Sequence, residues 1–132
     1  MSSGGQGQGP RGVSEQSLKA IVDFIPAMIW VKDASELRFV LVNKGAEGLL
    51  GVSRDKLVGK SDHDLFSPEQ ADALVARDRA FLSGDSSVDT HEETINTPNG
   101  VRTLRVKRFV IVEDGKPRYI LAICQDITER EA

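Results

Sequence analysis

The order of the predicted elements indicates an α+β protein, in which a largely antiparallel sheet carries its helices on one face. Three observations predict this class. Two short apolar runs separated by a turn come early in the chain, three longer apolar runs joined by tight turns come late, and the segments between them have helical patterning. Because turns join the runs within each group, neighbouring strands are expected to run in opposite directions.

The composition is that of one globular domain. Hydrophobic residues make up 39% of the 132 residues and charged residues 28%, both typical values. The net charge of −3 argues against a nucleic-acid partner, because such binding needs a basic stripe. No stretch approaches the roughly 20 apolar residues of a membrane span. The single cysteine, Cys124, excludes an internal disulfide and fits a cytoplasmic protein.

We expect one domain over residues 13–130. Residues 1–12 are rich in glycine and have no apolar periodicity, so they are predicted to be a flexible tail. At the other end, charged residues follow the last apolar run from Asp126 onward. We interpret this change as the start of a helix that leads into a further domain.

An amphipathic helix is predicted over residues 13–24, followed by two short strands. Apolar side chains recur there at helical spacing, namely at Leu18, Ile21, Val22 and Ile25. Pro26 should end the helix, because the residue before a proline disfavours helical backbone angles. Residues 27–33 and 39–43 are predicted to be strands, and the turn between them lets them pair as a hairpin.

Two further helices are predicted from their capping residues. Asn43 is a suitable N-cap for a short helix over residues 44–50, and Gly51 suits its C-terminal end. Residues 67–70 read Ser-Pro-Glu-Gln, which combines an N-cap serine with proline at the first helical position and glutamine at the third. This signal predicts a longer helix that ends near residue 83, with Asp78 interrupting its apolar stripe.

Three strands are predicted at the end of the chain, over residues 88–95, 102–112 and 118–127. Asn99-Gly100 and Asp114-Gly115 lie between them. Such dipeptides between apolar runs are strong hairpin signals, because glycine adopts the positive φ angles that tight turns need. The last three strands should therefore form an antiparallel meander.

Alternation along the strands separates the two faces of the sheet. One face is predicted to line a pocket beneath the helices. The candidate lining residues are Ile29, Val31, Leu41, Leu65, Phe66, Leu74, Ile95, Leu104, Ala122 and Cys124. Because nearly all of them are apolar, we expect either a small apolar ligand or side chains that fill the pocket completely.

The opposite face is too apolar to be left in water. Its candidate residues are Trp30, Val40, Val42, Leu121 and Ile123. Two covers are open at this stage. The N-terminal helix could pack there through Leu18, Ile21 and Val22, or a second copy of the chain could cover the face in a homodimer.

Motifs for catalysis and metal binding are lacking in the sequence. It contains neither a glycine-rich phosphate loop nor a Gly-x-Ser-x-Gly elbow, so no catalytic residue is predicted. His63, His91 and Cys124 lie in separate elements without metal-ligand spacing, so no metal site is predicted. We interpret His63 as a solvated or capping residue and His91 as an exposed strand position.

Three segments, in this order and spacing, resemble a PAS domain. They are Val31-Lys32-Asp33 followed by Phe39-Val40-Leu41-Val42-Asn43-Lys44, the turn Gly59-Lys60-Ser61-Asp62, and Asp126-Ile127-Thr128-Glu129. The resemblance covers about residues 14–130 and is to the type that precedes bacterial histidine kinases and diguanylate cyclases. It implies a PAS fold, a five-stranded antiparallel sheet with strand order 2-1-5-4-3 that cups a pocket under several short helices and one longer helix.

The resemblance also implies a function. Such a domain is a sensory module of a bacterial signal-transduction protein, often a two-component system, and relays ligand or dimerisation state to a C-terminal output domain. Asp126, Ile127 and Thr128 are the expected relay residues. Two alternatives are a ligand-free dimerisation module and a haem- or flavin-bearing redox or gas sensor.

Both cofactors are disfavoured by the residues. Flavin photochemistry of the light-oxygen-voltage type needs a cysteine near residues 62–66, and that segment has none. Haem-binding relatives place a histidine on the long helix, and residues 68–83 contain none. We therefore expect a regulatory domain without a bound cofactor.

Overall fold

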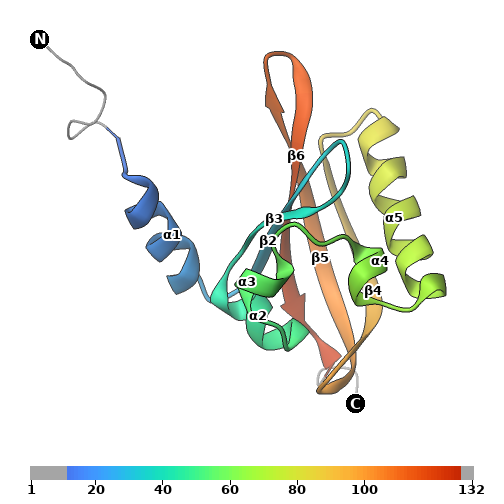
Figure 1. Cartoon of the computed structure of the whole chain (residues 1–132). Coiled ribbons are helices and arrows are strands. Elements are labelled where there is room, and N and C mark those ends of the chain that lie inside the picture. The colour runs from blue at the N-terminus through green and yellow to red at the C-terminus, as the bar shows by residue number, and fades with distance from the viewer. Residues whose placement is uncertain (1–11, 129–132) are drawn as a thin grey trace, which may run out of the picture.

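A computed structural model describes residues 12–128 of the chain as a five-stranded antiparallel sheet with helices on one face (Figure 1). The strands are β2 (Met28–Asp33), β3 (Phe39–Val42), β4 (Val88–Thr97), β5 (Gly100–Glu113) and β6 (Lys116–Asp126). They lie in the order β3-β2-β6-β5-β4, which confirms the expected fold and strand order. Most of the predicted tail, residues 1–11, lies outside the described residues.

The helices are α1 (Glu15–Phe24), α2 (Lys44–Leu50), α3 (Arg54–Leu57), α4 (Asp62–Leu65) and α5 (Pro68–Ser83). Helix α4 was expected to be a turn. It is held by a capping box, in which Ser61 N–H donates to Asp64 Oδ2 at 3.0 Å, and four residues are too few to show helical periodicity in a sequence. Within the described range, no helix is long and apolar enough to cross a membrane.

One fully buried side chain, Asn43, joins three elements. Its Oδ1 accepts hydrogen bonds from Ala46 N, which caps α2, and from Ile29 N in β2, at 3.0 and 2.9 Å. Its Nδ2 donates to the carbonyl oxygens of Val22 and Ala27 at 3.1 and 2.9 Å. The end of α1, the start of β2 and the start of α2 are therefore fixed to one another.

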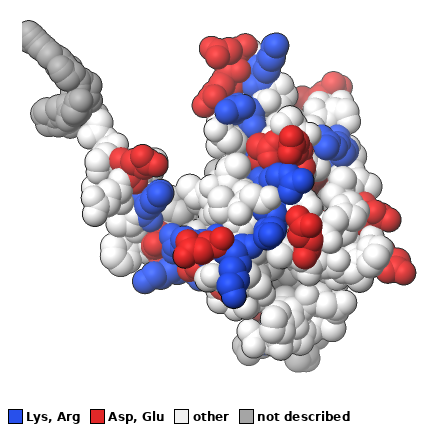
Figure 2. Space-filling view, viewed as in Figure 1, with Lys and Arg blue, Asp and Glu red and all other residues white. Residues whose placement is uncertain are grey.

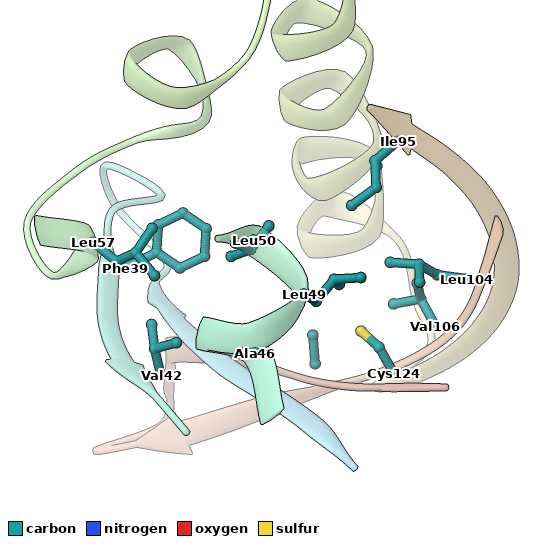
Figure 3. Close-up of a cluster of buried hydrophobic side chains, with 11 residues drawn as sticks. Phe39, Val42, Ala46, Leu49, Leu50, Leu57, Ile95, Leu104, Val106 and Cys124 are labelled. Atoms are coloured by element: carbon teal, nitrogen blue, oxygen red, sulfur yellow. The ribbon is translucent and has the colours of Figure 1, made fainter. Parts of the chain in front are cut away.

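The main core lies between α2, α3 and the face of the sheet that the helices cover, which we call the inner face (Figure 3). Its buried residues are Phe39, Val42, Ala46, Leu49, Leu50, Leu57, Ile95, Leu104, Val106, Ala122 and Cys124. Helix α2 packs closely against the chain at Ala27 because Gly45, in its first turn, has no side chain. A Cβ atom there would lie 2.6 Å from the Ala27 carbonyl oxygen, so α2 could not sit where it does with any larger residue.

The register of β2 and β3 corrects part of the face assignment. Trp30 lies opposite Val42 on one side and Ala122 on the other, so Trp30 and Val42 belong to the inner face rather than the outer one. Lys32 lies on the same side of β2 as Trp30, and an unpaired lysine is almost never buried. Alternation separates the two faces without showing which one is buried, and a charged residue such as Lys32 favours a solvent face as long as its partners are unknown.

The outer face, turned away from the helices, carries three of the strand residues that were expected in the pocket, all from β2 and β3. Ile29 lies opposite Ile123, and Val31 lies opposite Leu121 and Leu41. Leu121 and Ile123 are on the outer face as predicted, both half-buried. Val40 is 41% exposed on the edge strand β3.

Helix α1 does not cover this outer face. It extends to one side of the sheet (Figure 1), none of its residues is buried, and Leu18 and Ile21 are about half exposed. Its last turn is tied to the helical layer, since Asp23 accepts from Lys44 N and from the Arg54 guanidinium, at 3.0 and 2.9 Å. Of the two covers considered for the outer face, packing of α1 from the same chain is therefore excluded.

Replacing Asn43 by alanine should lower the free energy of unfolding by about 2–4 kcal/mol, because it leaves buried N–H and C=O groups without partners. The measurement is chemical denaturation followed by Trp30 fluorescence. Asn96→Ala is the matched control, since Asn96 is exposed and makes one long side-chain hydrogen bond. Equal stabilities of the two variants would contradict the role assigned to Asn43.

Candidate functional site

A small cavity of about 30 Å³ lies between the inner face of the sheet and the helices, with room for about one water molecule. Part of its wall is apolar and aromatic, formed by Trp30, Phe39, Leu50, Phe66, Leu74, Ile95, Val106, Ile120 and Ala122. The rest of the wall is charged, formed by Lys32, Asp62, Asp78, Glu93 and Arg108. The prediction of an almost wholly apolar lining is therefore wrong.

The ten predicted pocket residues fall into three groups. Those that line the cavity are Phe66, Leu74, Ile95 and Ala122. Those that pack in the core beside it are Leu65, Leu104 and Cys124. Ile29, Val31 and Leu41 lie on the outer face, as the strand register shows. The charged residues of the wall come from five elements and were all missed.

Four of these charged side chains, together with Asp89, form what we call the buried ionic network. Lys32 Nζ donates to Asp62 Oδ2 at 2.6 Å and to Asp78 Oδ2 at 2.9 Å. Arg108 Nη1 donates to the other oxygen of Asp78 at 2.6 Å. Arg108 also binds both oxygens of Asp89 through Nε and Nη2, at 3.1 and 2.6 Å. The network thus links α4 and α5 to strands β2, β5 and β4.

Burial and pairing act in opposite directions on the charges of this network. Burial by itself would lower the pKa of Lys32, but the carboxylates of Asp78 and Asp62 outweigh it and raise that pKa. Burial raises the pKa of Asp62, and Lys32 offsets this rise only in part. The ammonium of Lys32 is therefore charged at neutral pH, and both of its carboxylate partners raise its pKa in favour of that form.

Strand β4 adds a histidine–carboxylate pair on the inner face. His91 Nε2 lies 2.8 Å from Glu93 Oε2, and His91 Nδ1 lies 3.6 Å from Asp89 Oδ1. The His91 side chain is only 15% exposed, so the interpretation as an exposed strand position is wrong. Its inward direction follows from the register, because His91 lies opposite the buried Val106.

The other candidate ligand residues are separate from the cavity. His63 is exposed, with Nε2 2.8 Å from Asp72 Oδ1, as expected of a solvated residue. Cys124 is fully buried, and burial raises the pKa of its thiol, so it is protonated and packs as a small apolar group. Across residues 12–128, no three His, Cys, Asp or Glu side chains are placed to hold a metal ion.

The predicted relay residues fasten the end of β6 to β5. Ile127 N donates to the carbonyl of Thr103 at 2.9 Å, and Thr103 N donates to Thr128 Oγ1 at 2.8 Å. Asp126 Oδ1 accepts from Thr128 N and Oγ1, at 3.0 and 2.6 Å. The direction in which the chain leaves the sheet is therefore set by hydrogen bonds. The helix expected after this point lies outside the described residues.

Acidic and basic side chains are interspersed over the surface shown in Figure 2. Exposed side chains of opposite charge form ion pairs, such as Arg38 with Glu36 at 3.0 Å and Arg105 with Glu92 at 3.4 Å. On that face, basic side chains lie beside acidic ones rather than apart from them.

The arrangement of sheet, helices and inner cavity has known counterparts. The model of the PAS fold family matches residues 22–132. The chain belongs to the PAS family. In structure, it is similar to the PAS domain of BvgS from Bordetella pertussis, with a TM-score of 0.72 and 19% identity over 88% of both chains.

Two relatives in sequence are much longer than this chain. It is 34% identical over 119 residues to the uncharacterized protein y4lL of Sinorhizobium fredii, covering 87% of this chain and 14% of that protein. It is 29% identical over 117 residues to the methanogenesis regulatory histidine kinase FilI of Methanothrix harundinacea, covering 89% and 13%. This PAS domain is thus homologous to part of a sensor histidine kinase, as expected for a sensory module.

Replacing Asp78 by alanine should lower the free energy of unfolding by about 3–5 kcal/mol, because it removes one carboxylate from each of two buried cations. Thermal or chemical denaturation measures the change. Asp72→Ala on the same helix is the matched control, since the Asp72 side chain is 75% exposed. A loss below about 1 kcal/mol for Asp78→Ala would show that the network does not join the two layers.

Proposed function

We propose that this PAS domain senses the state of its inner cavity and relays it to an output domain that follows residue 132. The observation that carries the proposal is the buried ionic network. It forms most of the charged wall of the cavity and joins helices α4 and α5 to strands β2, β4 and β5. A change at the cavity wall therefore alters contacts in the helices and in the sheet. The length of FilI, of which the chain matches 13%, supports the presence of further domains.

Strand β6 is the route by which the change leaves the domain. Ala122 lines the cavity, and Asp126 to Thr128 fasten the same strand to β5 four residues later. An extended strand transmits displacement along its length, because its hydrogen bonds to β2 and β5 hold it as one body. The relay role of Asp126, Ile127 and Thr128 is part of this proposal.

Filling the cavity should change the output. In a fusion of residues 1–132 to a histidine kinase catalytic core, Ala122→Val should shift the autophosphorylation rate about fivefold or more in either direction, which is the usual size of such coupling. The added methyl groups occupy the cavity and move its wall. The matched control is Ala76→Val, at an exposed position of α5.

The relay would be contradicted if the Ala122→Val fusion shows a cooperative unfolding transition, and is therefore folded, but autophosphorylates at the wild-type rate. A change of the same size in Ala76→Val would show that the fusion responds to any substitution.

We also propose that the domain is a homodimer, with α1 and the outer face as the contact. Leu18 and Ile21 in the apolar stripe of α1 are 50% and 48% exposed, and Phe24 beside the stripe is 84% exposed, so much of this apolar surface is uncovered within the described residues. Leu121 and Ile123 are apolar and only half-buried on the outer face. A helix stripe and a sheet face of this kind are buried together when a second copy supplies the partner surface.

Ile123→Glu should convert the dimer to a monomer, because it places a charge in the centre of the apolar contact. Sedimentation velocity of the two proteins at equal concentration measures this. Ala76→Glu, on the exposed side of α5, is the control and should leave the dimer intact. Dissociation by both variants, or by neither, would refute this interface.

The proposal includes neither a catalytic role nor a resident haem or flavin. Helix α5 contains no histidine, and the chain's one thiol is buried on β6. The cavity of about 30 Å³ is far smaller than either cofactor requires. Cytoplasmic location is also part of the proposal and is supported by the single, unpaired cysteine.

A further inference from the structure

His91 lies between two carboxylates of its own strand, β4. Its Nε2 is 2.8 Å from Glu93 Oε2, and its Nδ1 is 3.6 Å from Asp89 Oδ1. The first distance is that of a hydrogen bond, and the second is too long for one. Nδ1 is buried and has no hydrogen-bond partner within residues 12–128. One side of the ring is therefore bound, and the other side faces a carboxylate that it does not reach.

The uncharged ring cannot satisfy both contacts. An ionised carboxylate only accepts hydrogen bonds and a neutral imidazole has one N–H, so the contact with Glu93 places that hydrogen on Nε2. Nδ1 is then a bare acceptor that faces a second acceptor. Hydrogen bonds from Arg108 lower the pKa of Asp89, which keeps this carboxylate ionised at neutral pH. A proton on Nδ1 turns the two opposed acceptors into a donor and an acceptor of opposite charge.

Charged groups from other elements also lie close to this part of β4. On the inner face they are Arg108 of β5, Asp78 and Arg77 of α5, Lys32 of β2 and Asp62 of α4. Arg77 is exposed and donates from Nη1 to the Glu92 carbonyl at 3.4 Å. The Glu92 side chain itself pairs with Arg105 on the other face of the sheet. Within the described range, the ion-pair contacts of the ring are those with Asp89 and Glu93.

The Asp89 carboxylate connects His91 to the buried ionic network. Its Oδ1, the oxygen nearest the ring, also accepts from Arg108 Nε at 3.1 Å, and its Oδ2 accepts from Arg108 Nη2 at 2.6 Å. To form a hydrogen bond, Nδ1 and Oδ1 must approach each other by about 0.5 Å. Arg108 and protonated His91 then share one acceptor oxygen. Because Arg108 Nη1 also binds Asp78 of α5 at 2.6 Å, a proton on His91 affects the contacts that join α5 to the sheet.

We propose that His91 is a proton-binding switch, in which Nδ1 takes up a proton from solvent, bonds to Asp89 and thereby rearranges the ion pairs of Arg108. This inference rests on the sensory function proposed above and names the proton as a signal of the domain. Imidazole is the side chain whose ordinary charge change falls between about pH 5 and 8. Strand β4 is outermost in the sheet and the His91 side chain is 15% exposed, so a small movement of that side chain gives water access to Nδ1.

The test follows the Nε–H group of Arg108 by NMR between about pH 5.5 and 8, in the 132-residue protein. The chain contains two histidines, so His63→Gln, at an exposed position, is the matched control for His91→Gln. In the wild type and in His63→Gln, the Arg108 signal should shift in one step, with the same midpoint as the ring signals of His91. In His91→Gln this step should be lost.

A step that persists in His91→Gln would overturn the inference and assign the proton to a carboxylate of the network, such as Asp62, whose pKa is raised by burial. An Arg108 signal that stays constant while the His91 ring titrates would overturn it as well. The comparison of the two midpoints is made in the wild type and requires no variant. It therefore decides the question even if His91→Gln does not fold.

The kinase fusion separates this inference from the relay. The ratio of its autophosphorylation rates at about pH 6 and about pH 8 should differ about fivefold between the wild type and His91→Gln, and should be the same in His63→Gln as in the wild type. The pH dependence of the kinase core itself cancels in this comparison. An Arg108 step without any difference in output would refute the relay and leave the proton switch standing. An output that responds to Ala122→Val, in a protein without the Arg108 step, would refute the switch alone.

Discussion

Asp78 joins helix α5 electrostatically to two strands of the sheet. Its two carboxylate oxygens accept from Lys32 of β2 and Arg108 of β5, two strands that are separated in the sheet by β6. A buried carboxylate is costly unless cations pair with it, and Asp78 has one cation at each of its two oxygens. The position of α5 over the sheet is therefore set by a requirement that apolar contacts do not impose.

The contacts between the helices and the sheet are therefore of two kinds, apolar in one region and charged in the other. Around α2 the contacts are apolar and close-packed, and side chains such as Leu49 and Val106 can repack against one another at low cost. Around α4 and α5 the contacts are charged and directional. Directional ion pairs are either made or broken, whereas apolar contacts adjust gradually, so this region is better suited to having two distinct states.

Local chemistry predicted the elements, because it acts over a few residues. The Asn43 and Ser67 caps and the Asn99-Gly100 turn each form as the sequence indicates. The charged part of the site was not predicted, because its partners are distant. Lys32 meets carboxylates 30 and 46 residues further along the chain, and alternation separates two faces without showing which one is buried. Asp78 was the available signal, since it interrupts an otherwise apolar helical stripe that faces the sheet.

The inward-facing charges of β4 have a consequence for how this sheet meets other chains. Strand β4 is outermost in the sheet, and an outermost strand is an open template for pairing with another chain. Here Arg77 already donates to the carbonyl of Glu92 at 3.4 Å, and Asp89 and Glu93 are held inward by Arg108 and His91. An added strand would disturb these pairs, so the groups that form the cavity wall also protect the domain from edge-to-edge aggregation.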